Sequence, residues 1–437
     1  MIGKLARDCF PDGQFPGSVS DVTNLFGKSK TLFEPSFEVD GYVARADILQ
    51  QRGEKANLVE VKSSLFDDGK VKPEHIDDMA YTAMVLTRAG VGIESVELMR
   101  LSRDWRLGMP NDALFRRTTH TDAVIARAKE FDREWDSIRT SVFSANRPEP
   151  QFIYACRECG YFDSDCLGKG LTDPIFQIPR LGEAKFSKLA AMGIHSVVAI
   201  PDGFALSDNQ RKVCRCIQSK QPVINAEELS ELLSKVDWPV GYLDFETFAT
   251  AIPLWANVAP HEAVATQYSL HVCNHAGAVV DHRHFLAEPT KDCRRNLAEQ
   301  LIADTAGLKT IVVYSGYEKR ILSALAQSCP DLDGAMTDLV GRLFDLEKAF
   351  SSAVCHPQFG GRTSIKVTLP VFVPDMDYSA LRIADGDSAI AAFSRLANGR
   401  CSSPEEETAL MDDLRAYCAQ DTLAMVRLHQ VLLTHIE

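Results

Sequence analysis

The sequence lacks several features that mark particular classes of protein. It has no run of about 18 consecutive apolar residues, the length that a transmembrane helix needs. The first residues, Met1 to Asp8, contain no apolar core of a secretion signal. The chain also has no internal repeat and no low-complexity tract. We therefore expect a soluble cytoplasmic protein without a membrane partner.

A surplus of positive charge is missing as well. The 437 residues include 47 Lys and Arg and 60 Asp and Glu, and the net charge of −13 argues against a protein that coats nucleic acid through bulk positive potential. Residues 1–150 carry 21 basic and 24 acidic side chains, residues 151–225 carry 9 and 7, and residues 226–437 carry 17 and 29. Only the middle of the chain is basic, and the acidic C-terminal half is either a solvated surface or partly a set of metal ligands.

What is present is typical of a globular α/β protein long enough for roughly three domains. Strand-like runs at 33–49, 56–63 and 91–101 alternate with helical runs at 73–89 and 121–144, which predicts an α/β domain over residues 1–147. A cysteine cluster at 148–170 and a small helical connector at 171–225 follow a proline-rich break. A second α/β pattern over residues 226–437 has predicted strands at 240–245, 265–272, 279–286 and 310–314 and helices at 318–327 and 404–433.

Two acidic residues and a lysine lie on neighbouring predicted strands. If residues 53–54 form a hairpin turn, residue i pairs with residue 107 − i, so Asp47 lies opposite Glu60 and Arg45 opposite Lys62. An Asp and a Glu at cross-strand spacing can chelate a divalent metal, and a lysine beside them can stabilise charge on a phosphate. The pattern indicates phosphodiester hydrolysis, although an edge hairpin with a surface ion pair would show the same spacing.

The spacing Asp47-x12-Glu60-x-Lys62 resembles the PD-(D/E)XK nuclease superfamily in its RecB-like branch. The resemblance implies metal-dependent cleavage, with Asp47 and Glu60 as metal ligands and Lys62 as the catalytic lysine. It also implies Glu34 as an additional upstream acid. RecB-like members carry a Gln-x-x-x-Tyr helix after the lysine, and here Asp77 stands where glutamine is expected.

Three of the 12 cysteines, Cys156, Cys159 and Cys166, fall within eleven residues, and a CxxC turn aims two thiolates at one point. They resemble the C-terminal ligands of the four-cysteine iron–sulfur cluster found in several RecB-like nucleases. That resemblance implies a [4Fe-4S] cluster, with zinc as an alternative because tetrahedral sulfur sites suit it equally well. The fourth ligand is not identified, and three explanations are open. The N-terminal domain is truncated, Cys9 takes the place of the fourth ligand, or no metal binds and the thiols are structural.

The connector contains a helix-hairpin-helix-like segment at 178–194, and a basic helix follows it. Turns of this kind can offer backbone N–H groups to phosphates, although packing of the helices is an equally good reason for the pattern. The candidate phosphate contacts are Lys185, Lys188, Arg211 and Lys212.

Acidic residues recur on three predicted elements of the C-terminal half. Asp244 and Glu246 alternate along a strand and so share one face, while Tyr417 and Asp421 lie four apart on one side of a helix. Glu318 starts a helix directly after a buried strand. A two-metal phosphodiesterase needs such acids to hold two cations about 4 Å apart. The alternative is that the three elements carry unrelated surface acids.

The order of these residues resembles the DEDD (DnaQ-like) family of 3′–5′ exonucleases, in its tyrosine-bearing subclass with an RNase H-like fold. The resemblance implies that Asp244, Glu246, Glu318 and Asp421 hold two Mg²⁺ or Mn²⁺ ions and that Tyr417 hydrogen-bonds the attacking water or the scissile phosphate. The family's middle acid is normally Asp, so Glu318 would coordinate from further back. Asp345 is a further candidate acid or a helix cap, and Lys366 is a phosphate contact or simply exposed.

A bacterial family of unknown function shares further motifs over nearly the whole chain, including those at 244–248 and 417–425. The sequence thus predicts an α/β nuclease with a RecB-like restriction-endonuclease-type domain, a helix-hairpin-helix-like connector and an RNase H-like mixed-sheet domain. We expect it to act as an exonuclease that processes DNA ends in repair or defence, with DNA favoured over RNA. The alternative is a non-catalytic nucleic-acid-binding or scaffold protein, because Asp77, Glu318 and the missing fourth cysteine depart from the active patterns.

Overall fold

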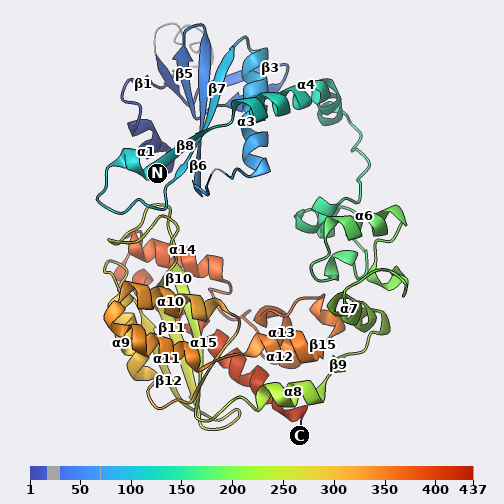
Figure 1. The fold of residues 1–437 in the computed structure, drawn as a ribbon, viewed down its shortest axis with the longest axis vertical. Helices are drawn as coiled ribbons and strands as arrows, with labels where there is room; N and C mark the ends of the chain where they lie inside the picture. Colours follow the sequence, from blue (N-terminus) through green and yellow to red (C-terminus); the bar gives the residue numbers. More distant parts are fainter. Residues whose placement is uncertain (17–29, 69, 437) are drawn as a thin grey trace. The chain divides into compact units, whose positions relative to one another are not determined.

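The computed structural model describes residues 1–16, 30–68 and 70–436 of a mixed α/β protein (Figure 1). The chain divides into two compact units. Unit 1 comprises Met1–Pro148 and Ala249–Ala263, and unit 2 comprises Glu149–Phe248 and Val264–Glu437. None of the helices in the described part of the chain combines the length and the hydropathy that a bilayer crossing requires.

Unit 1 contains a six-stranded sheet in the order β1-β2-β5-β6-β7-β8. Its strands are β1 Gly13–Gln14, β2 Thr31–Phe33, β5 Ile48–Arg52, β6 Lys55–Leu65, β7 Ile93–Leu101 and β8 Phe115–Thr119. A separate hairpin consists of β3 Ser36–Val39 and β4 Tyr42–Arg45, and the helices are α1 Ile2–Asp8, α3 Pro73–Arg88 and α4 Thr121–Phe143. The strands β6 and β7 are parallel and therefore need a crossover connection, which α3 provides. Pro73 is the first residue of α3, where the backbone N–H has no partner within the helix and proline is well tolerated.

The predicted hairpin register is confirmed for the paired residues, since Ile48 faces Val59 and Arg52 faces Lys55. The predicted position of Arg45 opposite Lys62 is wrong, because Arg45 lies in β4 and pairs with Ser36. The predicted run at 33–49 is broken by residues with left-handed backbone: φ is 51° at Glu34, 52° at Asp40 and 87° at Gly41. These residues turn the chain out of the main sheet before β5 begins.

The segment 249–263 follows β10 in the sequence but packs in unit 1. Ala251 and Ile252 lie against a hydrophobic cluster that contains Ile48 and Val59. The segment closes on itself, because the His261 amide donates to the carbonyl of Thr250 at 2.8 Å. A ring nitrogen of His261 lies 2.7 Å from the Ser63 carbonyl oxygen, one residue beyond Lys62.

Unit 2 begins with small helices around a core that includes the aromatic side chains Phe176 and Phe186, whose stacked rings lie 5.4 Å apart. The elements are η2 Tyr154–Glu158, α5 Phe162–Asp165, η3 Ile175–Gln177, α6 Glu183–Ala191, η4 Val197–Ala199, α7 Asp208–Ser219, β9 Val223–Ile224 and α8 Ala226–Leu233. A capping box between Ser207 and Gln210 fixes the start of α7.

A five-stranded sheet in the order β12-β11-β10-β13-β14 forms the centre of unit 2. Its strands are β10 Val240–Phe248, β11 Val264–Cys273, β12 Val279–Leu286, β13 Thr310–Val313 and β14 Leu343–Asp345. The strands β10, β11 and β12 are antiparallel neighbours, whereas β13 and β14 run parallel to β10. The strand β10 lies in the centre of the sheet, and its side chains point alternately to the two faces, both of which are covered by helices. Residues two apart on this buried strand therefore share one face.

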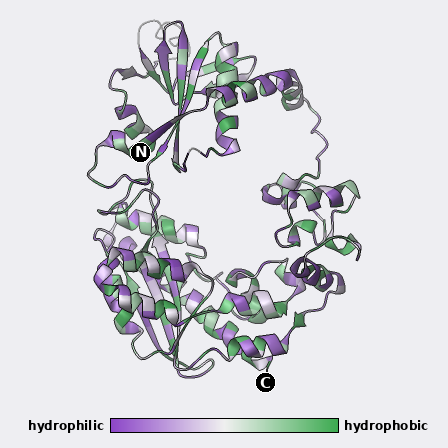
Figure 2. Ribbon diagram, viewed as in Figure 1, coloured by the Kyte–Doolittle hydropathy of each residue, from purple (hydrophilic) through white to green (hydrophobic). Residues whose placement is uncertain are grey.

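Helices cover both faces of this sheet. They are α9 Arg294–Asp304, α10 Tyr317–Ser328, α11 Asp333–Gly341, α12 Leu346–Ala353, α13 Ile365–Phe372, α14 Gly386–Ala397 and α15 Pro404–Thr434, and the short β15 Val354–Cys355 pairs with β9. Hydrophobic residues recur along these elements and do not form one long apolar run (Figure 2). Leu243 packs with α9, α10 and α11, whereas Tyr242 packs on the other face with α12 and α15.

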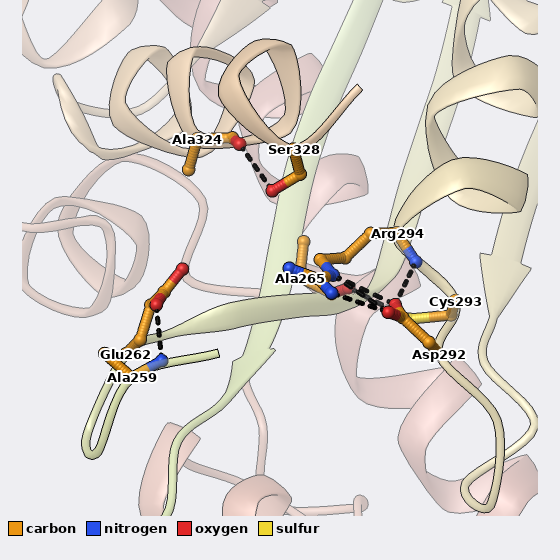
Figure 3. A network of polar contacts seen from close by, with 8 residues as sticks. All are labelled: Ala259, Glu262, Ala265, Asp292, Cys293, Arg294, Ala324 and Ser328. Atoms are coloured by element: carbon orange, nitrogen blue, oxygen red, sulfur yellow. Dashed lines mark hydrogen bonds and ion pairs between the residues drawn. The ribbon is translucent and has the colours of Figure 1, made fainter. Parts of the chain in front are cut away.

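Polar contacts at the start of α9 join it to β11 and order the turn before it. The Cys293 thiol donates to the carbonyl of Ala265 at 3.4 Å, and the Arg294 guanidinium pairs with Asp292 at 2.6 Å (Figure 3). Burial raises the pKa of the Cys293 thiol to about 12, so it stays a protonated donor. The bond from Cys293 helps to hold α9 in the layer that covers the sheet.

Candidate metal centre

Three of the predicted acids converge in unit 2. Asp244 and Glu246 point to the same face of β10 because they are two residues apart, and Asp421 reaches them from α15. One ligand oxygen from each lies within 4.8 Å of the other two. Within the described residues, this is the group of His, Cys, Asp or Glu side chains that could hold a metal ion.

Two tyrosines and a lysine border this acid group. Tyr378 donates a hydrogen bond from its hydroxyl to Asp421. Burial raises the pKa of the Asp421 carboxyl, and the hydrogen bonds from Tyr378 and Tyr417 oppose that rise. The Lys366 ammonium lies 5.4 Å from the ring centroid of each tyrosine and donates to the carbonyl of Ala384 at 2.9 Å. Tyr378 was not predicted, because it lies in the irregular segment between α13 and α14, where no periodic pattern marks it.

Burial sets the protonation of the acid group. It raises the pKa of Asp244 well above its ordinary value, and the negative charges of Asp421 and Glu246 add to this effect. The pKa of Glu246 rises to about 8 for the same two reasons, burial and the charge of Asp421, although Lys366 opposes the shift. Carboxyls in such surroundings hold protons at neutral pH unless a cation compensates their charge.

Glu318 lies in the first turn of α10, near the acid group but outside the 4.8 Å set. Its side chain is 3% exposed, and its Oε2 atom is buried without a hydrogen-bond partner. Burial raises its pKa to about 7, with a further rise from the charge of Asp345. A buried carboxylate oxygen without a partner is rare and requires an explanation, and a bound cation is one.

The donor set fits a hard divalent cation. Asp244, Glu246 and Asp421 offer carboxylate oxygens, which are the ligands that Mg²⁺ and Mn²⁺ prefer, and the unpartnered oxygen of Glu318 lies nearby.

Asp345 is the N-cap of α12, where its side chain accepts from the Glu347 amide at 3.1 Å. Asp345 therefore has a structural partner, and it also contributes negative charge next to Glu318.

The predicted acids and lysine of unit 1 also meet. The Asp47 carboxylate accepts a hydrogen bond from the Val61 amide at 2.8 Å. Burial and the nearby charge of Asp47 raise the pKa of Glu60 to about 7. Lys62 pairs with Glu60 at 2.8 Å and also with Asp78. Burial alone would lower the pKa of Lys62, but its hydrogen bonds to these two carboxylates outweigh burial and raise it.

Asp78 on α3 was not predicted, although it lies next to Asp77. The Asp77 carboxylate is bound by Arg127 of α4 at 2.7 Å, so the residue in the expected glutamine position faces a different helix. Glu34 pairs with Arg7 at 2.7 Å and lies 3.7 Å from the Arg45 guanidinium. The structure therefore gives these two acids ion-pair partners within unit 1.

The three clustered cysteines lie in and around η2 and α5. The Cys156 thiol donates to the carbonyl of Gln151 at 3.5 Å, Cys159 is exposed, and Cys166 follows α5. In the part of the chain that the structure describes, these sulfur atoms do not form a set of ligand atoms within 4.8 Å. Their geometry does not fit an iron or zinc site as it stands, and the metal stays a prediction.

Most of the predicted phosphate contacts of the connector have partners in the protein. Lys185 donates to the Gln210 side chain at 2.7 Å, Arg211 donates to the carbonyl of Asp202 at 3.1 Å, and Lys212 donates to that of Ser352. Lys188 lies on the exposed side of α6. The first three side chains therefore help to hold unit 2 together, whether or not they also meet a phosphate.

The fold and the site define a mixed α/β protein with a three-carboxylate centre, in which Asp421 is buried and Asp244 and Glu246 are half-buried. Residues 241–364, which include Asp244, Glu246 and Glu318, match the family described as "Domain of unknown function (DUF2779)". A solved chain titled "Crystal structure of SSO0001" is 18% identical with a TM-score of 0.18, and the match covers 34% of this chain and 66% of that chain, just under two thirds of its length. No curated protein matches the chain.

Proposed function

We propose that the protein is a metal-dependent nuclease that hydrolyses phosphodiester bonds at the acid group of unit 2, acting as a 3′–5′ exonuclease. The observation that carries this proposal is the convergence of Asp244, Glu246 and Asp421, which are separated by up to 177 residues in the sequence, within 4.8 Å. The mixed sheet that carries the first two acids is compatible with the RNase H-like fold that the motifs imply.

In this proposal, Asp244, Glu246 and Asp421 would hold Mg²⁺ or Mn²⁺, with Glu318 available as a further acid. A bound divalent ion lowers the pKa of a water ligand and stabilises charge on the scissile phosphate. The Tyr417 hydroxyl would hydrogen-bond the attacking water or the phosphate. The Lys366 ammonium, held over two tyrosine rings, would attract the phosphate to the acid group.

The second proposed site is the PD-(D/E)XK motif of unit 1. The proximity of Asp47 and Glu60 and the pairing of Lys62 with Glu60 support this proposal. The pairing of Lys62 with Asp78 is an addition to the expected pattern and keeps the ammonium next to the acids. Asp47 and Glu60 would hold a divalent ion, and Lys62 would stabilise negative charge on the phosphate.

Cleavage of end-labelled single- and double-stranded DNA and RNA with Mn²⁺ tests both sites. We expect Asp244→Asn to abolish stepwise shortening from the 3′ end while leaving the melting temperature close to that of the wild type in EDTA. Lys62→Ala should remove only products that depend on unit 1. The change Asp304→Asn, at an acid outside both groups, is the matched control.

The outcomes separate the two sites from the scaffold alternative. Loss of shortening only in Lys62→Ala would move the chemistry to unit 1 and contradict the exonuclease assignment. Absence of any cleavage by folded, Mn²⁺-loaded wild type would favour a non-catalytic nucleic-acid-binding protein. Shortening of DNA but not RNA by the wild type would support the predicted preference.

A further inference from the structure

A groove lies inside unit 2 where the connector meets the loop that precedes α13. One cavity of about 930 Å³ is bordered by η3, the end of α7 and the loop at 357–362. A second cavity of about 360 Å³ shares Arg180 and Arg362 with the first. We call these two adjoining cavities the connector groove.

The walls of the connector groove are held together by close packing. Gly361 has a left-handed backbone with φ of 72°, and a Cβ atom built there would lie 1.9 Å from the carbonyl oxygen of Gln177. The loop therefore presses directly on η3, which only glycine allows. Lys212 of α7 bonds to the carbonyl of Ser352, and β9 pairs with β15, so both walls belong to one packed body.

The groove is positively charged in an acidic protein. Two aspartates, Asp163 and Asp173, line it. The basic residues that line it are Arg157, Arg180, Lys212, Lys220 and Arg362. This local surplus contrasts with the net charge of −13 for the whole chain. A ligand that prefers this surface over the rest of the protein is therefore an anion.

Three of the basic side chains are available to a ligand. Among the described residues, the side chains of Arg180, Lys220 and Arg362 have no hydrogen bond or ion pair, and all three are exposed. Arg157, by contrast, is paired with Glu158 at 2.8 Å. Two unpaired guanidiniums that border both cavities can each bind a phosphate through two parallel hydrogen bonds.

Two further features of the groove suit a nucleotide better than a simple anion. The half-buried ring of Phe176 contributes to the lining, and an aromatic face can stack on a base of any identity. The Oε1 atom of Gln177, also in the lining, is buried without a hydrogen-bond partner. An amino or hydroxyl group of a nucleotide would satisfy this acceptor.

We propose that the connector groove binds a single nucleic-acid strand, with Arg180 and Arg362 on its phosphates. A cavity of this size admits a few nucleotides and not a duplex, and grooves that combine basic and aromatic side chains are the usual sites for single strands. The identity of the polymer rests on the proposed nuclease function, which the groove extends by naming a separate substrate-binding surface. None of these residues belongs to the acid group.

The test is binding of a fluorescent single-stranded DNA 20-mer, and of the matching RNA, followed by anisotropy in EDTA across a salt series. For Arg180→Ala/Arg362→Ala we expect about 25-fold weaker binding at 0.1 M salt than for the wild type. The slope of log K against log salt should also fall in magnitude by about 1.4, which corresponds to two lost phosphate contacts on a single strand.

The control is Lys169→Ala/Lys309→Ala, which removes two exposed positive charges outside the groove and should keep the wild-type slope. Arg180→Lys/Arg362→Lys should keep most of the slope because it keeps the charge. The proposal is overturned if the arginine pair binds like the wild type, if the control pair loses as much, or if the wild type binds neither strand. Because no metal is present, these outcomes do not depend on whether Asp244 supports cleavage.

Discussion

The acidic side chains near β10 crowd several negative charges into a buried or half-buried space. Asp244, Glu246 and Asp421 repel one another, and Glu318 keeps a buried oxygen without a hydrogen bond. A buried group of like charges lowers the stability of a protein unless protons or cations neutralise it. Stability and ion binding should therefore be linked at these residues, and two predictions follow from that link.

The first prediction concerns pH. The pKa of Glu246 in the folded protein is about 8, above its ordinary value of 4.5, so between these values the folded state holds a proton that the unfolded state has lost. In EDTA, the melting temperature should therefore fall as the pH rises from about 5 to about 8. Saturating Mn²⁺ should reduce this fall, because the ion stabilises the ionised form. A pH dependence that is unchanged in Glu246→Gln would contradict the prediction.

The second prediction concerns Tyr378, whose hydroxyl donates to Asp421 and opposes the rise that burial causes in the pKa of that carboxyl. Tyr378→Phe should weaken Mn²⁺ binding by about 10-fold or more, since partners of metal ligands commonly contribute that much. Calorimetric titration measures the affinity. Tyr268→Phe is the matched control, because Tyr268 donates to Asp304 at 2.5 Å, outside the acid group. Equal Mn²⁺ affinities for both variants would contradict the role of Tyr378.

At the scale of elements, local periodicity was sufficient for much of the fold. The predicted helix at 404–433 is α15, Pro404–Thr434, and the hairpin register of β5 and β6 follows from its two-residue turn. Both features are determined by residues that are close together in the sequence, so local sequence patterns are sufficient to predict them. Asp244, Glu246 and Asp421 could be predicted because a spaced motif resembles that of known exonucleases.

Contacts between distant elements could not be predicted from periodicity. Tyr378 reaches Asp421 from an irregular segment, and Asp78 reaches Lys62 from a helix where the neighbouring Asp77 stands at the expected glutamine position. The basic lining of the connector groove joins residues that are 182 positions apart, such as Arg180 and Arg362. Such pairs form only through tertiary packing, which leaves no period in the sequence.

The third prediction concerns the loop that precedes α13. Gly360 and Gly361 both have left-handed backbones, but a Cβ atom has room at Gly360, whereas at Gly361 it would clash with the Gln177 carbonyl oxygen. Gly361→Ala should therefore lower the free energy of unfolding by about 1–3 kcal/mol more than Gly360→Ala. Urea unfolding of both variants measures the difference. Equal destabilisation would show that the loop does not press on η3.

At the scale of the whole molecule, the two units are interleaved in the sequence. Unit 1 takes the segment 249–263 from the middle of the polypeptide that otherwise builds unit 2. This segment begins three residues after Glu246, and its His261 ring contacts the carbonyl of Ser63, next to Lys62. One short piece of chain thus leads from an acid of one proposed site to the neighbour of the lysine of the other.

The fourth prediction follows from this arrangement. A protein of residues 1–148 alone should be less stable than the same residues joined through a flexible linker to 249–263, because Ala251 and Ile252 cover the cluster around Ile48 and Val59. The apolar burial corresponds to a free-energy difference of roughly 1–3 kcal/mol. Thermal melting measures the difference, with Ile252→Ser in the joined protein as the control. Identical melting of all three would exclude a stabilising role for the segment.

The borders of the units have a consequence for inheritance. The chain passes between the units three times, at 148/149, 248/249 and 263/264. A gene fusion or a recombination event with a single breakpoint can therefore deliver unit 1 whole only by carrying part of unit 2 with it, and the reverse holds for unit 2. We expect the two units to be gained and lost together across genomes, even if only one of them cleaves.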